Sequence, residues 1–134
     1  MLKKLSAPVA PAQTIEKLPV FTATDRAAAL KALEKGCDFL AQISSGGKWG
    51  QPGKPDAGMS AMALAAIQAR PTPRPAAQQK LIDDGLAWLA SLQQADGSIH
   101  DGKLANYTTS AAIMALAGSG DAQWKPVIDR KSVV

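Results

Sequence analysis

Acidic side chains and a single histidine are the residues of this 134-residue chain best suited to acid–base chemistry. Asp83 and Asp84 form an adjacent carboxylate pair, and His100 directly precedes Asp101. A protonated carboxyl group can act as a general acid, and an imidazole oriented by a carboxylate can act as a general base. Helical periodicity places Asp83 and Asp84 on the polar face of an amphipathic segment, which predicts solvated charges. We interpret His100 and Asp101 as exposed loop residues that could orient one another.

Thiol and metal chemistry have little support in the pattern. Cys37 is the only cysteine, so it cannot form an internal disulfide, and its helical context predicts a small buried apolar residue. A zinc site needs several ligands at short spacings, and His100 lies in a different part of the chain. Asp56 precedes an apolar segment and is predicted to cap it or to place an anion in its first turn. We therefore assign no catalytic residue, no metal ligand and no cofactor.

Composition predicts a globular, all-α protein. Hydrophobic residues make up 46% of the chain and aromatic residues only 4%, which favours closely packed helices over sheets. The net charge of +4 comes from scattered basic residues, so we expect no nucleic-acid partner. No run approaches the ~18 apolar residues of a membrane span. Because Pro8 and Pro11 interrupt the segment after Lys3 and Lys4, no signal peptide is visible. The chain as written is expected to be soluble, although an earlier start codon would leave export open and the localisation unknown.

Helical periodicity divides the chain into alternating amphipathic and apolar segments. The pattern predicts an extended Ala- and Pro-rich segment (1–24), an amphipathic helix from Asp25 capped by Thr24, a loop (44–58), an apolar helix (59–69), a Pro-rich connector (71–75), an amphipathic helix (76–94), a Gly-rich loop (95–105) and an apolar helix (107–117) capped by Asn106. The chain therefore contains two helical hairpins.

The two hairpins are copies of one repeat, spanning residues 25–70 and 75–118. The paired residues are Gly36 with Gly85, Phe39 with Trp88, Leu40 with Leu89, Gly47 with Gly97, Trp49 with Ile99, Asp56 with Asn106, Ser60 with Ser110 and Ala61 with Ala111. An apolar helix needs neighbours on every side, and two hairpins cannot supply them. We expect an incomplete α/α toroid with amphipathic outer helices and apolar inner helices; an open solenoid is the competing architecture.

The shared positions resemble the repeat of the squalene–hopene cyclase and prenyltransferase superfamily, over about residues 26–118. The residues that carry this resemblance are Gly36, Phe39, Gly47, Trp49, Gly85, Trp88, Gln93 and Gly97. The first copy has Ser44 where that repeat has Gln, and the second has Ile99 where it has Trp. For these positions we predict structural roles: Gln bonds backbone groups at the helix end, Gly permits a sharp turn, and the aromatic residue fills the gap between hairpins.

The resemblance implies polyprenyl or triterpene substrates for the intact family. Its cyclases use an Asp-x-Asp-Asp acid and its protein prenyltransferases a zinc site of Asp, Cys and His, and neither occurs in this chain. We therefore expect an inactive fragment whose partners are the remaining repeats and, in the intact protein, an apolar isoprenoid ligand. Tyr107, Thr108 and Ser110 are candidates for the cavity rim, and the methionines are assigned to the core (Met59, Met62 and Met114). The alternative is a non-catalytic toroid or solenoid that serves as a binding or scaffold module.

The last segment, residues 121–134, is predicted to begin a third repeat with another amphipathic helix. Residues 129–134 correspond to the translation of a common sequencing-library adapter, so we expect a non-native tail. With apolar faces left open, the isolated chain should be marginally stable and should bind hydrophobic dyes.

Overall fold

The described part of the chain, residues 20–132 of a computed structural model, is mostly helical, which confirms the predicted all-α class. The elements are α2 (Ala23–Ile43), β1 (Gly50–Gln51), β2 (Lys54–Pro55), α3 (Ala57–Gln68), α4 (Ala76–Ser91), α5 (Ala105–Gly118), the 3-10 turn η2 (Ala122–Trp124) and α6 (Lys125–Ser132). The strands β1 and β2 form a small antiparallel hairpin inside the loop predicted between the first two helices. Most of the predicted N-terminal segment and the last two residues lie outside the described residues.

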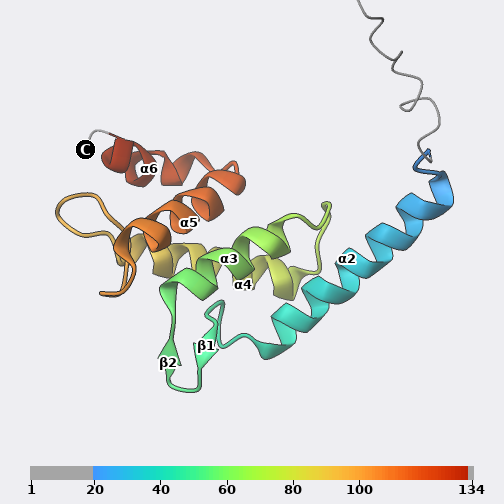
Figure 1. The fold of residues 1–134 in the computed structure, drawn as a ribbon, viewed down its shortest axis with the longest axis horizontal. Coiled ribbons are helices and arrows are strands. Elements are labelled where there is room, and N and C mark those ends of the chain that lie inside the picture. The colour runs from blue at the N-terminus through green and yellow to red at the C-terminus, as the bar shows by residue number, and fades with distance from the viewer. Residues whose placement is uncertain (1–19, 133–134) are drawn as a thin grey trace, which may run out of the picture.

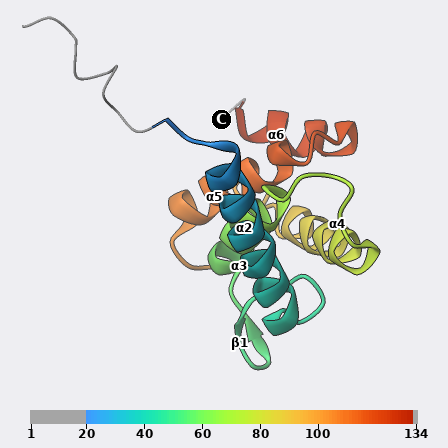
Figure 2. The same ribbon diagram turned by 90° about the vertical axis from the view of Figure 1, so that its right-hand side faces the viewer.

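The two apolar helices, α3 and α5, lie side by side, and α4 packs behind them (Figure 1). In the turned view of Figure 2, α4 lies to the right of this pair. Helix α6 lies above the other helices and contacts α5. Helix α2 extends away from the rest of the molecule and packs on α3. The core lies where α3, α4 and α5 meet, and its largest fully buried side chains are Leu64, Ile67, Ile82, Leu86, Leu89, Ile99 and Leu116.

The first amphipathic helix begins two residues earlier than predicted, because Thr22 and not Thr24 is its cap. The Thr22 hydroxyl accepts a hydrogen bond from the Asp25 backbone N–H (3.1 Å), and the Asp25 carboxylate accepts one from the Thr22 N–H (2.9 Å). This reciprocal pair is a capping box, which satisfies two backbone donors at once. The bond from the Thr22 backbone lowers the pKa of Asp25.

The starts of the two apolar helices also differ from prediction. Asp56 caps α3 as predicted and accepts from the Met59 N–H (2.8 Å), but the helix begins at Ala57, inside the predicted loop. The predicted cap Asn106 is wrong, since α5 begins at Ala105. The Leu104 carbonyl already accepts from the Thr108 N–H (2.9 Å), which leaves Asn106 within the first turn.

The last described segment folds as a turn and a short helix, as the periodicity predicted. Trp124, Val127 and Ile128 are partly buried against the core. Helix α6 continues through residues 129–132, so part of the predicted tail is helical; its non-native origin stays a prediction. Within residues 20–132, no helix combines the length and the apolar character needed to cross a membrane.

Candidate functional site: the repeat interface and an apolar groove

Two glycines of the repeat motif meet where the first loop packs on α4. A Cβ atom added to Gly85 would lie 2.5 Å from the Gly47 carbonyl oxygen and 2.7 Å from a Leu64 methyl carbon. Gly47 adopts φ +82°, a left-handed conformation that favours glycine. Any side chain at Gly85 would push the loop and α3 away from α4. The two glycines therefore permit a close contact between the first loop and α4.

The residue after Gly47 extends this contact. The Lys48 ammonium lies 5.3 Å from the centre of the Trp88 ring, within the range of a cation–π interaction. Trp88 is partly buried against the core. Its counterpart in the first copy, Phe39, is 58% exposed and does not fill a gap between hairpins within the described residues.

The residue that ends each glycine loop is buried and held through its backbone. The Trp49 N–H donates to the Ser60 hydroxyl (2.8 Å), which in turn donates to the Trp49 carbonyl (3.1 Å). In the second hairpin the Ile99 N–H donates to the Thr109 hydroxyl (3.0 Å), whose own proton has two acceptors within reach, the Ala105 carbonyl (2.6 Å) and the Ile99 carbonyl (3.2 Å). Thr109 is thus the counterpart of Ser60.

The predicted pairing of Ser60 with Ser110 is therefore wrong by one residue. Ser110 is exposed and its hydroxyl donates to the Asn106 carbonyl in the same helix (2.9 Å). The pairings of Asp56 with Asn106 and Ala61 with Ala111 assumed the same offset. Helix α5 begins at Ala105, two residues sooner than the alignment assumed, and the hydroxyl that bonds the loop is displaced by one residue.

Gln93 joins the end of α4 to the segment that follows α5. Its side-chain amide donates to the Gly97 carbonyl (3.1 Å) and to the Val127 carbonyl (2.9 Å). Gly97 has φ +88°, close to the +82° of Gly47. Gln93 lies two residues beyond the end of α4, and its side chain therefore satisfies one carbonyl group in the second loop and one in α6.

A cluster of polar side chains that local sequence patterns did not predict ties α2 to α4. The Arg70 guanidinium donates to Asp38 (2.8 Å) and to Gln78 (3.1 Å), and the Gln78 amide donates to Asp38 (2.6 Å). The hydrogen bond from Arg70 holds the pKa of Asp38 below its ordinary value. The residues come from α2, from the chain just after α3 and from α4, so no local spacing could have identified them.

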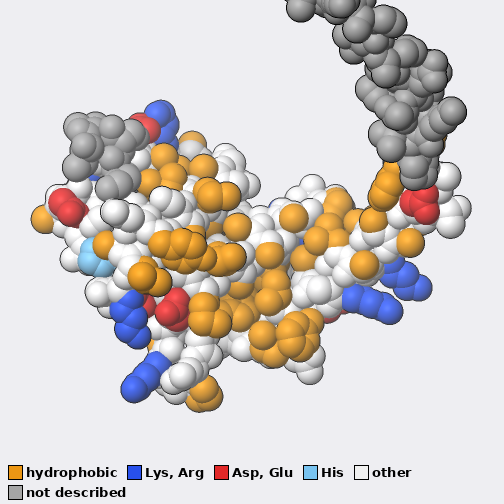
Figure 3. Space-filling model, viewed as in Figure 1, with side chains coloured by type: hydrophobic (Ala, Val, Ile, Leu, Met, Phe, Trp, Pro, Cys, Tyr) orange, Lys and Arg blue, Asp and Glu red, His pale blue; other side chains and the backbone are white. Residues whose placement is uncertain are grey.

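An apolar groove lies between the inner helices, on the face opposite α4. It has a volume of about 290 Å³ and is lined by Met62, Ala65, Tyr107, Ser110, Ala111 and Met114. Figure 3 shows apolar side chains gathered over α3 and α5 on this face. The Tyr107 hydroxyl donates to the Met62 sulfur across the groove.

The exposure of the residues in and around the groove contradicts two predictions made from the sequence. The methionines assigned to the core are exposed instead: Met59 by 57%, Met62 by 55% and Met114 by 68%. Thr108, a candidate for the rim, is only 3% exposed, and its hydroxyl donates to the Lys103 carbonyl (3.2 Å). Tyr107 and Ser110 do line the groove.

The acidic candidates lie outside the groove. Asp83 and Asp84 are exposed, as predicted, and Asp84 accepts from Lys80 (2.6 Å), which raises the pKa of that amine. His100 and Asp101 do not orient one another. The His100 Nδ1 accepts from the Gly102 N–H (3.0 Å), whereas Asp101 accepts from the Ala57 N–H at the start of α3 (2.9 Å).

Cys37 is 2% exposed, which confirms the predicted burial. Its sulfur lies 3.9 Å from the Ile67 carbonyl oxygen, where α2 packs on α3. Burial raises the pKa of the thiol, which disfavours the reactive thiolate. Across residues 20–132, no three His, Cys, Asp or Glu side chains come together in a way that could hold a metal ion.

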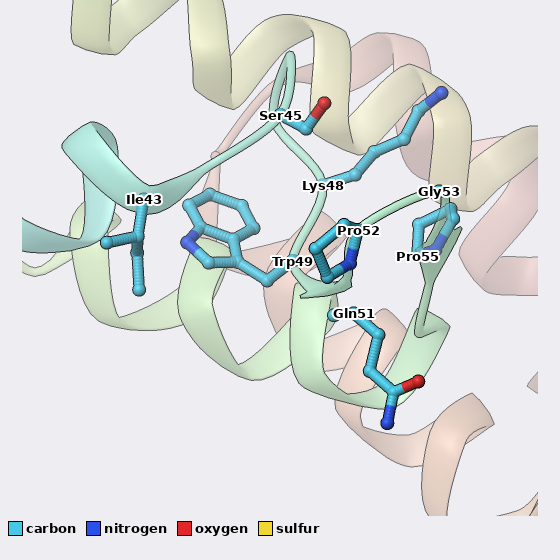
Figure 4. Close-up of a pocket in the computed structure, with 9 residues that line it drawn as sticks. Ile43, Ser45, Lys48, Trp49, Gln51, Pro52, Gly53 and Pro55 are labelled. Carbon is cyan, nitrogen blue, oxygen red and sulfur yellow. The ribbon is translucent and has the colours of Figure 1, made fainter.

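A second cavity, of about 490 Å³, lies within the first loop and is drawn in Figure 4. Its lining includes Ile43, Trp49, Pro52 and Pro55, while the Lys48 side chain extends toward α4. This cavity borders the exposed end of α2, away from the groove between the inner helices.

Comparisons of this chain with protein-family models, with curated proteins and with solved structures found no match. The candidate ligand site is therefore defined by its own geometry, and the groove between α3 and α5 is the surface that best fits a small apolar molecule.

Proposed function

We propose that this chain forms part of a repeat protein similar to the squalene–hopene cyclase and prenyltransferase superfamily, and that its inner helices bind an apolar isoprenoid molecule. The ligand class is a polyprenyl or triterpene hydrocarbon chain. The groove between α3 and α5 would be one segment of a longer apolar wall.

The observation that carries this proposal is the exposure of the inner helices along one face. Met62 and Met114 expose more than half of their surface there, beside Tyr107. Large apolar side chains that gather on an exposed face mark ligand or protein contacts. Flexible thioethers adapt to irregular apolar ligands, and an aromatic ring adds contact with unsaturated carbon.

The size of the groove limits what it can hold. Its volume of about 290 Å³ is at the lower end of ligand pockets, which suits part of a prenyl chain and leaves a triterpene incompletely covered. Its polar side chains are the hydroxyl-bearing Tyr107 and Ser110, and none of the residues that line it is acidic. The chain alone would therefore bind an isoprenoid weakly and would not protonate it.

The alternative is a non-catalytic binding or scaffold module built from the same repeat. The observation that favours it is the chemistry of the groove, whose lining contains thioethers, methyl groups and hydroxyls but no proton donor of suitable strength. An Asp-x-Asp-Asp motif or a zinc ligand set elsewhere in the intact protein would favour the enzyme.

Methyl NMR with farnesol as the probe tests the proposed binding. The methionine methyl resonances of Met62 and Met114 should shift as farnesol is added, with an affinity in the range of about 0.1–1 mM. Ala111→Phe should weaken binding by about tenfold or more, since the ring would occupy the groove. Met59→Gln is the matched control, because Met59 is equally exposed but does not line the groove.

Decanol, a straight-chain alcohol, distinguishes isoprenoid binding from general affinity for apolar molecules. Farnesol should bind more tightly than decanol, and Ala111→Phe should affect farnesol more strongly. Equal effects of both alcohols, or unchanged methyl resonances, would contradict the proposal.

A further inference from the structure

Helix α2 exposes a row of small and apolar residues, and no other helix within residues 20–132 covers this row. This row, the α2 stripe, consists of Ala29, Ala32, Gly36, Phe39 and Ile43, which recur every three or four residues and share one side of the helix. Phe39 is 58% exposed and Ile43 is 54% exposed. A Cβ atom added to Gly36 would have no heavy atom within 4 Å.

The corresponding side of α4 is covered by the repeat that precedes it. Gly85, the counterpart of Gly36, touches the Gly47 carbonyl and the Leu64 side chain, and Trp88, the counterpart of Phe39, lies under Lys48. Leu92, which corresponds to Ile43, is partly buried against the core. In α4, this side of the helix is therefore covered by the preceding loop and by the apolar helix that follows that loop.

We propose that the α2 stripe is a docking surface for a further unit of the same repeat, joined ahead of α2. The glycine loop of that unit would lie on Gly36, its basic residue on Phe39 and its apolar inner helix against Leu33 and Leu40. This inference rests on the repeat organisation in the proposed function, but it does not depend on an isoprenoid ligand.

A second copy of this chain does not offer the required unit. The first loop and α3 are already covered by α4, through Gly47 and Leu64. The second loop and α5 are contacted by α6, because the Arg130 guanidinium donates to the Ala95 carbonyl (3.4 Å) and α6 packs on α5. The occupant is therefore an additional loop and inner helix. The cavity in Figure 4, which Ile43 borders, would lie at the edge of that contact.

A chain made of residues 1–75 followed by residues 27–134 tests the proposal. This extended chain places a duplicate of the first loop and α3 ahead of the original α2, with Pro75 joined to Ala27, the counterpart of Ala76. Hydrogen exchange of the original α2 amides around Gly36 should slow by about tenfold or more relative to the natural chain. The melting temperature should also rise.

The effect of Gly36→Ala on Tm should have opposite signs in the natural chain and at the original α2 of the extended chain. A general stabilisation by the added unit would not produce this difference. In the natural chain the added methyl group meets open space and improves helix propensity, so Tm should rise by about 2 °C. At the original α2 of the extended chain the same change should lower Tm by about 4 °C or more, as expected at a Gly47–Gly85 type of contact. In the duplicate α2 of that extended chain, which again has no preceding unit, Gly36→Ala should raise Tm.

The proposal is overturned if Gly36→Ala raises Tm at both positions, or if α2 exchanges equally fast in the natural and extended chains. Dimerisation of the natural chain that Phe39→Ser abolishes would also overturn it, because the α2 stripe would then serve a second copy. None of these outcomes depends on farnesol binding, so a failure here is separable from a failure of the proposed ligand site.

Discussion

At the scale of single residues, Asp38 shows how α2 and α4 are joined by side chains far apart in the sequence. Arg70 and Gln78 both donate to its carboxylate, although Asp38 itself remains largely exposed. Because these bonds favour the charged form, the pKa of Asp38 is lowered in the folded chain. Its contribution to stability is therefore present above the pKa of the unfolded chain and is lost as pH falls through the lower folded value.

Asp38→Asn should lower Tm by about 1–3 °C at pH 7, and this difference should be smaller at pH 3, below the ordinary pKa of an aspartate. Thermal melts of both proteins at the two pH values measure it. Comparing the two proteins separates the effect of Asp38 on Tm from the effects of Asp25 and Asp121, whose pKa values are also lowered. In an Arg70→Gln background the pH dependence of the substitution should largely disappear. A difference that is the same at both pH values would rule out the ion pair as its origin.

At the scale of elements, each glycine loop is tied to the inner helix that follows it by one hydroxyl. Ser60 bonds both backbone groups of Trp49, and Thr109 bonds both backbone groups of Ile99. Both hydroxyl residues are almost fully buried. The two hairpins therefore share a loop–helix contact as well as the order of their helices.

Thr109→Val should destabilise the chain by about 1–3 kcal/mol, because the buried Ile99 N–H loses its acceptor while the side-chain volume is kept. Urea denaturation followed by circular dichroism measures this free energy of unfolding. Ser110→Ala is the neighbouring control and should change stability by less than about 0.5 kcal/mol. If Ser110→Ala lowered the free energy of unfolding more than Thr109→Val, the result would favour Ser110 over Thr109 as the counterpart of Ser60.

Local sequence patterns predicted the elements more completely than their contacts. The alternation of amphipathic and apolar segments, the start of α4 at Ala76, the Asp56 cap and the burial of Cys37 were all predicted, since each follows from spacing or from a short-range hydrogen bond. The hairpin inside the first loop was not predicted. The candidate groove was predicted only in part, through Tyr107 and Ser110.

At the scale of the whole molecule, apolar surface remains open on two sides. One is the groove face of α3 and α5 in Figure 3, and the other is the α2 stripe. Helix α2 buries only Cys37 along its described length, whereas the shorter α4 buries Gln78, Ile82, Gly85, Leu86 and Leu89. The contrast in burial between α2 and α4 is what the proposed docking of a further unit on α2 would remove.

The isolated chain should therefore bind a hydrophobic dye such as anilinonaphthalene sulfonate in its native state. Combined Met62→Gln and Met114→Gln substitutions should reduce the dye fluorescence by about half, since they remove apolar surface from one of the two open sides. Sedimentation at several concentrations would show whether the chain also self-associates. A monodisperse, cooperatively melting monomer that binds no dye would contradict the expectation.

The sequence by itself determined the all-α class, the alternation of helix types and the repeated positions of Gly36 and Gly85, because these depend on periodicity and on residue types at short spacings. Only the tertiary structure decided that the inner-helix methionines face outward, that Thr109 replaces Ser110 as the counterpart of Ser60, and that Gly36 is open. The physical reason is that hydrophobicity records which side chains favour burial, whereas burial itself depends on neighbours supplied by distant parts of the chain.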